Sequence, residues 1–304
     1  MSRIRIGTRG SALALAQSNW VKAQLERHDA ETAVELLVIK TSGDRFADTP
    51  IQNLGNKGVF TKEIEDALLR GEVDLAVHSM KDLPTELPPG LVIAAVPKRE
   101  DPRDVLVTRG RNRLADLASS TTVGTGSLRR RAQLLHYRSD LAIVPIRGNV
   151  DTRLRKLDEG QVDALVMAAA GLKRIGRGDR IGEFLADEIC VSAVAQGALG
   201  IEARKEASVC ERLAFLHDPA TCAEIAAERS MLDFLGGGCH VPIGARASVS
   251  GGELKIIGVV AGADGGRLCR ASLIGPAEQA ENLGRRLAED LLRQGADKLL
   301  ADAR

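Results

Sequence analysis

Aromatic side chains and net charge are both scarce in this sequence. Phenylalanine, tryptophan and tyrosine make up 2% of the 304 residues, and the formal net charge is only +1. Proteins that bind single-stranded nucleic acid stack bases on aromatic rings, and proteins that bind duplexes or anionic membranes carry a strongly basic field. We therefore expect no nucleic-acid partner and no membrane partner. Any basic site must be a local cluster.

Long apolar runs and paired cysteines are also missing. No apolar segment approaches the roughly 20 residues that cross a bilayer. The opening MSRIRIGTRGS leads into a predicted strand without the apolar core of a signal peptide. The cysteines show neither CxxC spacing nor the even number of a disulfide framework; they are Cys190, Cys210, Cys222, Cys239 and Cys269. We expect free thiols in a cytoplasmic protein.

What the sequence does contain is a repeated α/β pattern. Short apolar strands alternate with helical segments, and twice a strand leads through a GT…S turn into a helix, at 7–11 and at 124–127. After residue 217, three short strands with glycine-rich turns and a helix over 276–294 predict a small α+β domain. The expected fold class is therefore α/β, with two similar α/β domains facing one another and a smaller α+β C-terminal domain.

A chain of this length exceeds one ordinary hydrophobic core. We predict three domains with these bounds: 1–97 together with 198–216, 98–197, and 217–304. The charged, proline-bearing segment 98–103 is a plausible hinge between the first two. We predict a strand over 192–204 that returns the chain to the first domain, followed by a helix over 208–216.

The segment VDLAVHSMKDLP carries the strongest candidate for chemistry. Its apolar start, Val73–Val77, predicts a buried strand, so the polar residues after it would lie at the carboxyl end, where open α/β sheets bind ligands. Asp82 follows Lys81 there, and such a carboxylate can stabilise a cationic intermediate and exchange protons with it. His78 and Ser79 share this place. The alternative is that Lys81 and Asp82 form a solvated surface pair.

Arginines accompany the turns that open several predicted helices. Helix starts offer free N–H groups to anions, and arginine binds carboxylate or phosphate through a planar fork. Several such turns at the strand ends of two facing domains predict a polyanionic small ligand. The basic residues concerned are Arg9, Arg129, Arg130, Arg147, Arg153, Lys173 and Arg174. Each turn taken singly could be an ordinary helix cap, and each arginine an ordinary solvated side chain.

Two further segments have more than one interpretation. Cys239 follows three glycines and could be a reactive thiol, although an isolated cysteine is more often a small buried hydrophobe. A metal site with His240 is a poor interpretation because adjacent residues rarely reach one ion, and we expect no metal. The polar segment 42–58 is long for a compact domain, and such a segment is usually a mobile lid or disordered.

Seven motifs, in the order in which they occur, decide between these alternatives. They are VHSMKDLP, REDPRDVLV, VGTGSLRRRAQL, RGNVDTRLRKL, AAAGLKRIG, AQGALGIEAR and GGGCHVPIGA. Together they resemble the porphobilinogen deaminase family, also called hydroxymethylbilane synthase, from Arg3 to about Gly295. Any one motif is weak, but the combination is highly specific.

The resemblance implies a transferase of tetrapyrrole biosynthesis. It implies head-to-tail condensation of four porphobilinogen molecules onto a covalent dipyrromethane primer, with loss of ammonia at each step and release of 1-hydroxymethylbilane. The implied fold has two domains like those of type II periplasmic binding proteins and a third, smaller one. One dipyrromethane per chain would be held by a thioether to Cys239, and Asp82 would be catalytic. We also expect a monomer.

The resemblance further implies two sets of anion-binding residues. For the cofactor they are Ser79, Lys81, Thr125, Ser127, Arg129, Arg130 and Arg147. For the substrate they are Arg9, Ser11, Lys57, Arg153 and Arg174. Each pyrrole brings an acetate and a propionate, so a growing chain needs many cations, and loss of ammonia leaves a cationic azafulvene that Asp82 would stabilise.

The sequence departs from the family pattern at a few positions. Asn53 stands in place of a lysine in the predicted lid, Gly126 in place of a serine, and Gly10 in place of a common glutamine, while Ser192 and Ala195 alter the usual PAVGQGA. The first removes one cationic contact and the second one hydroxyl donor. None touches Asp82 or Cys239.

Two rival interpretations predict different features. An anion receptor of the periplasmic type would carry no covalent pyrroles and gives the third domain no role. A regulatory effector-binding protein would need a DNA-reading element, and the sequence shows no basic helix-turn-helix pattern.

Overall fold

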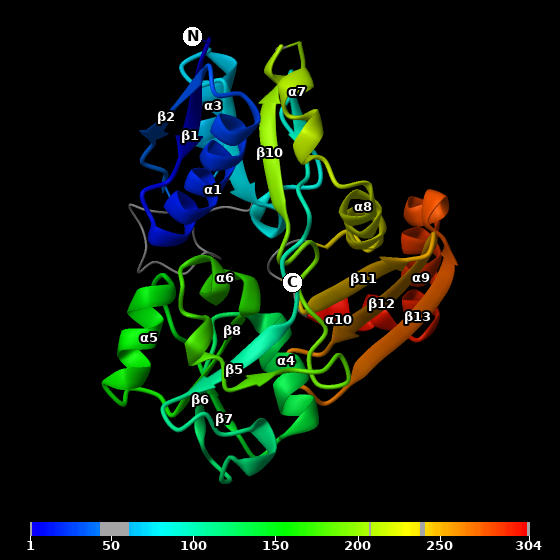
Figure 1. Ribbon diagram of the computed structural model, residues 1–304. Coiled ribbons are helices and arrows are strands. Elements are labelled where there is room, and N and C mark those ends of the chain that lie inside the picture. Colours follow the sequence, from blue (N-terminus) through cyan, green and yellow to red (C-terminus); the bar gives the residue numbers. More distant parts are fainter. Residues whose placement is uncertain (1, 43–60, 207, 238–240, 303–304) are drawn as a thin grey trace. The chain divides into compact units, whose positions relative to one another are not determined.

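The computed structural model describes residues 2–42, 61–206, 208–237 and 241–302 (Figure 1). The chain divides into two compact units. The first contains residues 1–99 and 198–219, and the second contains residues 100–197 and 220–304. The second unit holds two separate sheets. The border between the predicted second and third domains stays a prediction.

The first unit is built on one mixed sheet. In spatial order its strands are β2 (Thr32–Val38), β1 (Ser2–Thr8), β3 (Leu75–Ser79), β10 (Leu199–Arg204) and β4 (Leu91–Ala95). Strand β1 pairs in parallel with β2 and β3, whereas β10 runs antiparallel to both of its neighbours. The segment after residue 197 thus enters the middle of a sheet otherwise made by the first 99 residues.

Alternating side chains of this sheet face two different helical layers. Leu75 and Val77 pack in one core with α1 (Ala12–His28) and α7 (Val209–Arg212), while Ala76 packs in another with α3 (Lys62–Leu69). This is the two-residue period of a strand buried on both faces.

The second unit repeats this strand order in its α/β sheet. The strands are β7 (Ala142–Val144), β6 (Thr122–Gly124), β8 (Ala164–Ala168), β5 (Asp104–Thr108) and β9 (Glu183–Phe184). Here β6 is parallel to β7 and β8, and β5 runs antiparallel beside β8 as β10 does beside β3. Helix α4 (Leu128–Tyr137) packs on one face, and α5 (Val150–Asp158) and α6 (Ala169–Arg174) pack on the other.

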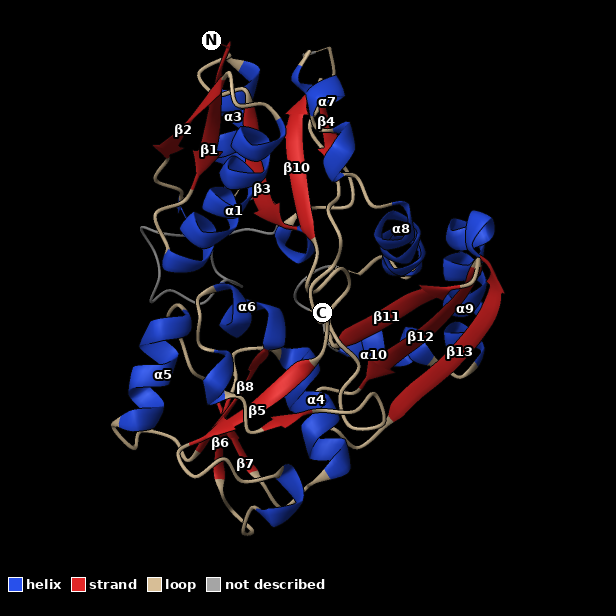
Figure 2. Cartoon of the chain, in the orientation of Figure 1, coloured by secondary structure: helices blue, strands red, loops and turns tan. Residues whose placement is uncertain are grey.

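The rest of the second unit is an antiparallel sheet covered by helices (Figure 2). Its strands are β11 (Ile243–Ser250), β12 (Glu253–Ala261) and β13 (Leu268–Pro276). Its helices are α8 (Pro219–Phe234), α9 (Ala280–Arg293) and α10 (Ala296–Asp302). Leu283, Leu287 and Leu291 recur every four residues on α9, which packs against β12 and β13. The predicted fold class, two α/β sheets of similar strand order with a smaller α+β part, is confirmed.

Two predicted elements are corrected by the structure. The strand expected over 192–204 begins only at Leu199, because Ala195 and Gly197 have positive φ angles of 58° and 90° and interrupt it. The helix expected over 208–216 is one short turn, α7, followed by the 3-10 helix η5. The 3-10 helices are η2 (Met80–Asp82), η3 (Leu114–Asp116), η4 (Gly178–Arg180), η5 (Ala214–Leu216) and η6 (Ala277–Gln279).

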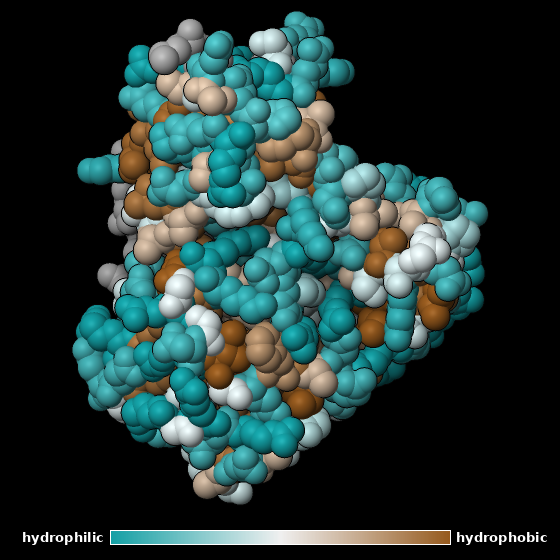
Figure 3. All heavy atoms as spheres, in the orientation of Figure 1, coloured by the Kyte–Doolittle hydropathy of each residue, from teal (hydrophilic) through white to brown (hydrophobic). Residues whose placement is uncertain are grey.

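Within the described residues, no helix has both the length and the apolar character that a bilayer crossing requires. On the face drawn in Figure 3, hydrophilic side chains cover most of the surface, and apolar ones form small separate groups. That face offers no continuous apolar surface.

Candidate active site

The turn that carries Lys81 and Asp82 continues directly from strand β3. Ser79 ends the strand, and its hydroxyl accepts a hydrogen bond of 2.8 Å from Gln17 Nε2 on α1. The N–H of Met80 donates to the carbonyl of Ala198 at 3.0 Å, which ties the turn to the start of β10. Asp82 is exposed, and its carboxylate forms no hydrogen bond or ion pair with the residues that the structure describes. The turn therefore presents this carboxylate to solvent.

A buried polar pair lies behind this turn. His78 Nε2 is 3.0 Å from Glu202 Oε2, and both side chains are almost completely enclosed. Glu65 of α3 is buried close to them, and burial raises the pKa of its carboxyl, with the charge of Glu202 acting in the same direction. Neither glutamate belongs to the predicted site residues.

Arg9 and Ser11 stand at the start of α1. The Ser11 hydroxyl accepts a hydrogen bond of 3.3 Å from the N–H of Ala14, so it acts as an ordinary N-cap. Ser18 and Thr8 bond to each other at 2.8 Å immediately beside it. The Ser11 hydroxyl therefore caps the helix, which is the structural alternative to ligand binding. Its contact with substrate stays a prediction.

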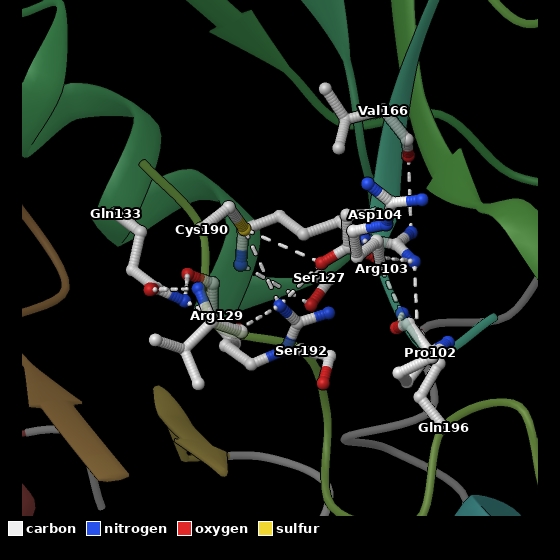
Figure 4. A network of polar contacts seen from close by, with 12 residues as sticks. Pro102, Arg103, Asp104, Ser127, Arg129, Gln133, Val166, Cys190, Ser192 and Gln196 are labelled. Atoms are coloured by element: carbon white, nitrogen blue, oxygen red, sulfur yellow. Dashed lines mark hydrogen bonds and ion pairs between the residues drawn. The ribbon is translucent and has the colours of Figure 1, made fainter. Parts of the chain in front are cut away.

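In the second unit, one carboxylate gathers two arginines (Figure 4). Asp104, at the start of β5, is completely buried. It accepts a 2.6 Å hydrogen bond from Arg129 Nη1, and two from Arg130, of 3.0 Å from Nε and 2.7 Å from Nη2. Gln196 Nε2 donates to it at 2.8 Å. A carboxylate with this many charged donors is held ionised.

The charges of this network shift two pKa values in opposite directions. Burial alone would raise the pKa of Asp104, but the positive charges of Arg129 and Arg130 bring it well below its usual value. Burial raises the pKa of the Cys190 thiol to about 12, and Asp104 reinforces that shift. The thiol stays protonated and donates to Asp104 at 3.3 Å. Cys190 is therefore a structural cysteine.

Arg129 and Arg130 are consequently held inside the protein rather than extended into solvent. Beyond Asp104, Arg129 donates to the carbonyl of Val191 at 2.7 Å and Arg130 to that of Val166 at 3.1 Å. Both guanidinium groups are nearly enclosed. Their contact with the cofactor stays a prediction.

Two other arginines lie beside this network without a carboxylate of their own. Burial lowers the pKa of Arg153 to about 10, and the positive charges of Arg130 and Arg147 add to the effect. Arg153 Nε donates to the carbonyl of Gly148 at 2.8 Å. Neither Arg147 nor Arg153 forms an ion pair with a carboxylate among the described residues. Positive charge is therefore in excess here, as an anion-binding site requires.

Helix starts border this excess of positive charge. The Ser127 hydroxyl accepts from the N–H of Arg130 at 3.4 Å and caps α4, and Asn149 caps α5. The Thr125 hydroxyl accepts from the N–H of Ser127 at 3.2 Å. The N-terminal ends of both helices add partial positive charge.

Arg174 is placed differently from the other predicted substrate ligands. Its Nη2 donates to the carbonyl of Gly197 at 2.6 Å, and the neighbouring Lys173 pairs with Glu100 at 2.9 Å. Glu100 N–H in turn donates to Gly197 O at 3.2 Å. Burial lowers the pKa of Arg174 to about 10. The end of α6 thus holds together the two segments by which the chain enters this unit at Glu100 and leaves it at Gly197. A substrate contact of Arg174 stays a prediction.

Three predictions lie outside the described residues. They concern Lys57, Cys239 and, apart from Ser42, the lid over 42–58. Four buried carboxylates were missed by the sequence analysis: Asp104, Glu202, Glu65 and Glu228. For Asp104 and Glu202 the signal was available, because each is a charged residue within an otherwise apolar strand.

Comparison with known proteins identifies the family. Residues 4–212 match the family model described as "Porphobilinogen deaminase, dipyromethane cofactor binding domain", and residues 222–293 match "Porphobilinogen deaminase, C-terminal domain". The chain belongs to the porphobilinogen deaminase family. A porphobilinogen deaminase of Syntrophobacter fumaroxidans is 52% identical over 98% of this chain and 97% of its own length. That of Pelobacter propionicus is 50% identical over 99% and 97%.

Among solved structures, the chain is similar to the methionine-binding protein MetQ, at 13% identity and a TM-score of 0.45, over 75% of this chain and 94% of that one. Membership in the porphobilinogen deaminase family rests on the family models and the curated relatives. It makes the chain a transferase with the family's dipyrromethane cofactor-binding domain, as the motifs predicted.

The residues present suit such a cofactor. A dipyrromethane carries acetate and propionate side chains, and the structure has an excess of guanidinium groups around Arg147 and Arg153. Arg147 and Arg153 have no ion-pair partner among the described residues, and burial, with the neighbouring positive charges, lowers the pKa of Arg153. A bound carboxylate would offset this costly charge.

Proposed function

We propose that this protein is a hydroxymethylbilane synthase that condenses four porphobilinogen molecules in tetrapyrrole biosynthesis. The observation that carries the proposal is the positive cluster of Arg130, Arg147 and Arg153. Among the described residues, its one paired carboxylate is Asp104, which Arg129 shares. Such a cluster suits a ligand whose charged groups are mostly carboxylates. Porphobilinogen and its oligomers are ligands of that kind.

Asp82 would stabilise the cation that forms during the reaction. When porphobilinogen loses ammonia, its C–N bond breaks and an azafulvene cation remains. The exposed carboxylate of Asp82, in the turn after β3, would stabilise that cation. A C–C bond then forms at the methylene carbon, and the proton displaced from the accepting pyrrole goes to the Asp82 carboxylate.

The other residues would bind and orient. Arg147 and Arg153 would hold acetate and propionate groups by charge-assisted hydrogen bonds, and the N–H groups at the starts of α4 and α5 would add to the field. When bound, the dipyrromethane supplies a fixed end for chain growth. We propose Cys239 as its point of attachment and Lys57, Lys81 and Arg9 as further carboxylate ligands. The proposal includes a cytoplasmic monomer.

Turnover of porphobilinogen tests the proposal. The purified protein should consume porphobilinogen, release one ammonia for each molecule consumed, and yield one bilane for every four. An anion receptor would bind porphobilinogen in dialysis without releasing ammonia, and that result would refute the proposed activity. Glu86→Gln, on the exposed loop after the turn, serves as a control that should retain full turnover.

A further inference from the structure

Two glutamates and a histidine are buried behind the turn that carries Lys81 and Asp82. Glu202 is 0% exposed, and Glu65 and His78 are each 6% exposed. His78 Nε2 and Glu202 Oε2 are 3.0 Å apart. Glu65 Oε1 and Glu202 Oε1 are buried without a hydrogen-bond partner among the described residues. Unpartnered buried oxygens cost stability, so this cluster is a poor device for folding alone.

Strand pairing places these residues on one face of the sheet. His78 of β3 lies opposite Gly200 of β10, and Ala76 lies opposite Glu202. Paired residues share a face, and so do residues two apart on one strand. Ala76 packs into the core formed with α3, and α3 also carries Glu65. The three polar side chains therefore lie together between the sheet and α3.

The turn rests directly on this layer. A methyl group at Gly200 would lie 2.7 Å from Met80 Sδ and 3.1 Å from Leu83 Cδ1, so the absence of a side chain lets the turn approach the strand. Met80 and Leu83 are both buried and flank Lys81 and Asp82. Gly200 lies opposite His78 and also contacts Met80 and Leu83. A change in the pairing of His78 with Glu202 would therefore shift the turn through this one residue.

The charges in this layer favour one arrangement. Burial raises the pKa of Glu65, and Glu202 reinforces that shift. His78 faces Glu202 from the paired strand and can donate a proton to it. No arginine or lysine takes part in this pair in the described part of the chain.

We propose that His78, Glu202 and Glu65 are positioning residues for the reaction, because they fix the turn from Ser79 to Asp82 and thereby the place of the Asp82 carboxylate. This inference rests on the proposed function. The cluster itself does not contact substrate. It acts through Met80 and Leu83, and its effect should appear in the chemical step rather than in binding.

The decisive experiment compares Glu202→Gln with Glu206→Gln, an exposed glutamate after the same strand. Glu202→Gln should lower kcat about 10- to 100-fold, with KM changed less than about threefold, because a small misplacement of a reacting group has effects of this size. His78→Asn should do the same, and the double variant should lose no more than the more impaired single variant. Glu206→Gln should match the parent protein.

A second variant keeps the test decisive if Glu202→Gln fails to fold. Gly200→Ala changes no charge but displaces Met80, and it should show the same loss of kcat at unchanged KM. Thermal unfolding and intact mass are recorded for every variant, so that activity is compared only among folded proteins with equal pyrrole content. Normal kcat in folded Glu202→Gln or Gly200→Ala overturns the inference. A parent protein that leaves porphobilinogen unconsumed overturns the proposed function instead.

Discussion

The carboxylate of Asp104 is completely buried and accepts two hydrogen bonds from the guanidinium of Arg130, from Nε at 3.0 Å and from Nη2 at 2.7 Å. Arg129 donates a third charged hydrogen bond, at 2.6 Å. The negative charge of Asp104, at the start of β5, thus holds the positive charges of Arg129 and Arg130, at the start of α4. The stability of the second unit and the field of its anion-binding region both depend on this group.

Asp104→Asn should destabilise the protein by about 3–5 kcal/mol, because it leaves two buried guanidinium groups without a counter-charge. Urea unfolding at neutral pH measures this. The matched control is Asp158→Asn, which breaks the half-exposed pair with Arg180 and should cost less than about 1 kcal/mol. The pKa of Asp104 is lowered in the folded protein, so its contribution is present above the usual carboxyl pKa and is lost as pH falls toward the lowered value. Equal stability of the two variants would contradict this account.

Asp82→Asn should abolish most turnover without affecting folding. The carboxylate is exposed and has no partner among the described residues, so its replacement removes no contact on which the fold depends. We expect kcat to fall by at least about 100-fold and the unfolding midpoint to stay unchanged. Steady-state kinetics and a thermal melt decide this, with Glu86→Gln as the control. A kcat close to that of the parent would exclude Asp82 from the chemistry.

The arrangement around Arg130 shows where prediction from sequence stops. The helix caps Ser127 and Asn149 were predictable, because a cap contacts N–H groups a few residues away. The pairing of Arg129 with Asp104 was not, since it depends on β5 lying beside β8 and on α4 packing over both. Sequence analysis therefore identified the arginines by type and place but not their partner.

The segment before β10 shows the same limit in the backbone. Its apolar residues predict a strand from 192, yet Ala195, which stands where the family pattern has a glycine, adopts a left-handed φ. The cause lies elsewhere in the chain, because Glu228 Oε2 of α8 accepts the N–H of Ala195 at 2.6 Å. The apolar run at residues 73–77 did predict β3, because that strand is buried by its own side chains.

Glu65→Gln should change how stability depends on pH. The pKa of Glu65 is raised in the folded protein by burial, so this group stabilises the fold at low pH and the contribution is lost as pH rises through the raised pKa. The glutamine variant lacks that loss and should gain stability relative to the parent as pH rises above the usual carboxyl pKa. Urea unfolding across this range measures the difference. A constant difference at all pH values would contradict the assignment.

Arg153→Met should stabilise protein that lacks the cofactor and weaken protein that carries it. Burial and two neighbouring arginines already lower the pKa of Arg153 to about 10, so its charge is costly until an anion binds. In a Cys239→Ser background we expect a gain of about 1 kcal/mol. With Cys239 present, the variant should need more porphobilinogen for half-maximal rate. Arg155→Met, an exposed arginine on the same helix, should show neither effect.

The central claim is that this chain carries two covalently linked pyrroles and uses them to polymerise porphobilinogen. Intact mass spectrometry of the purified protein, followed by mapping of the modified peptide, tests it most directly. The account predicts a mass above that of the sequence by one dipyrromethane, located on the peptide that contains Cys239 and absent from Cys239→Ser. A protein with the mass of its sequence alone, or with the adduct on another cysteine, would contradict it.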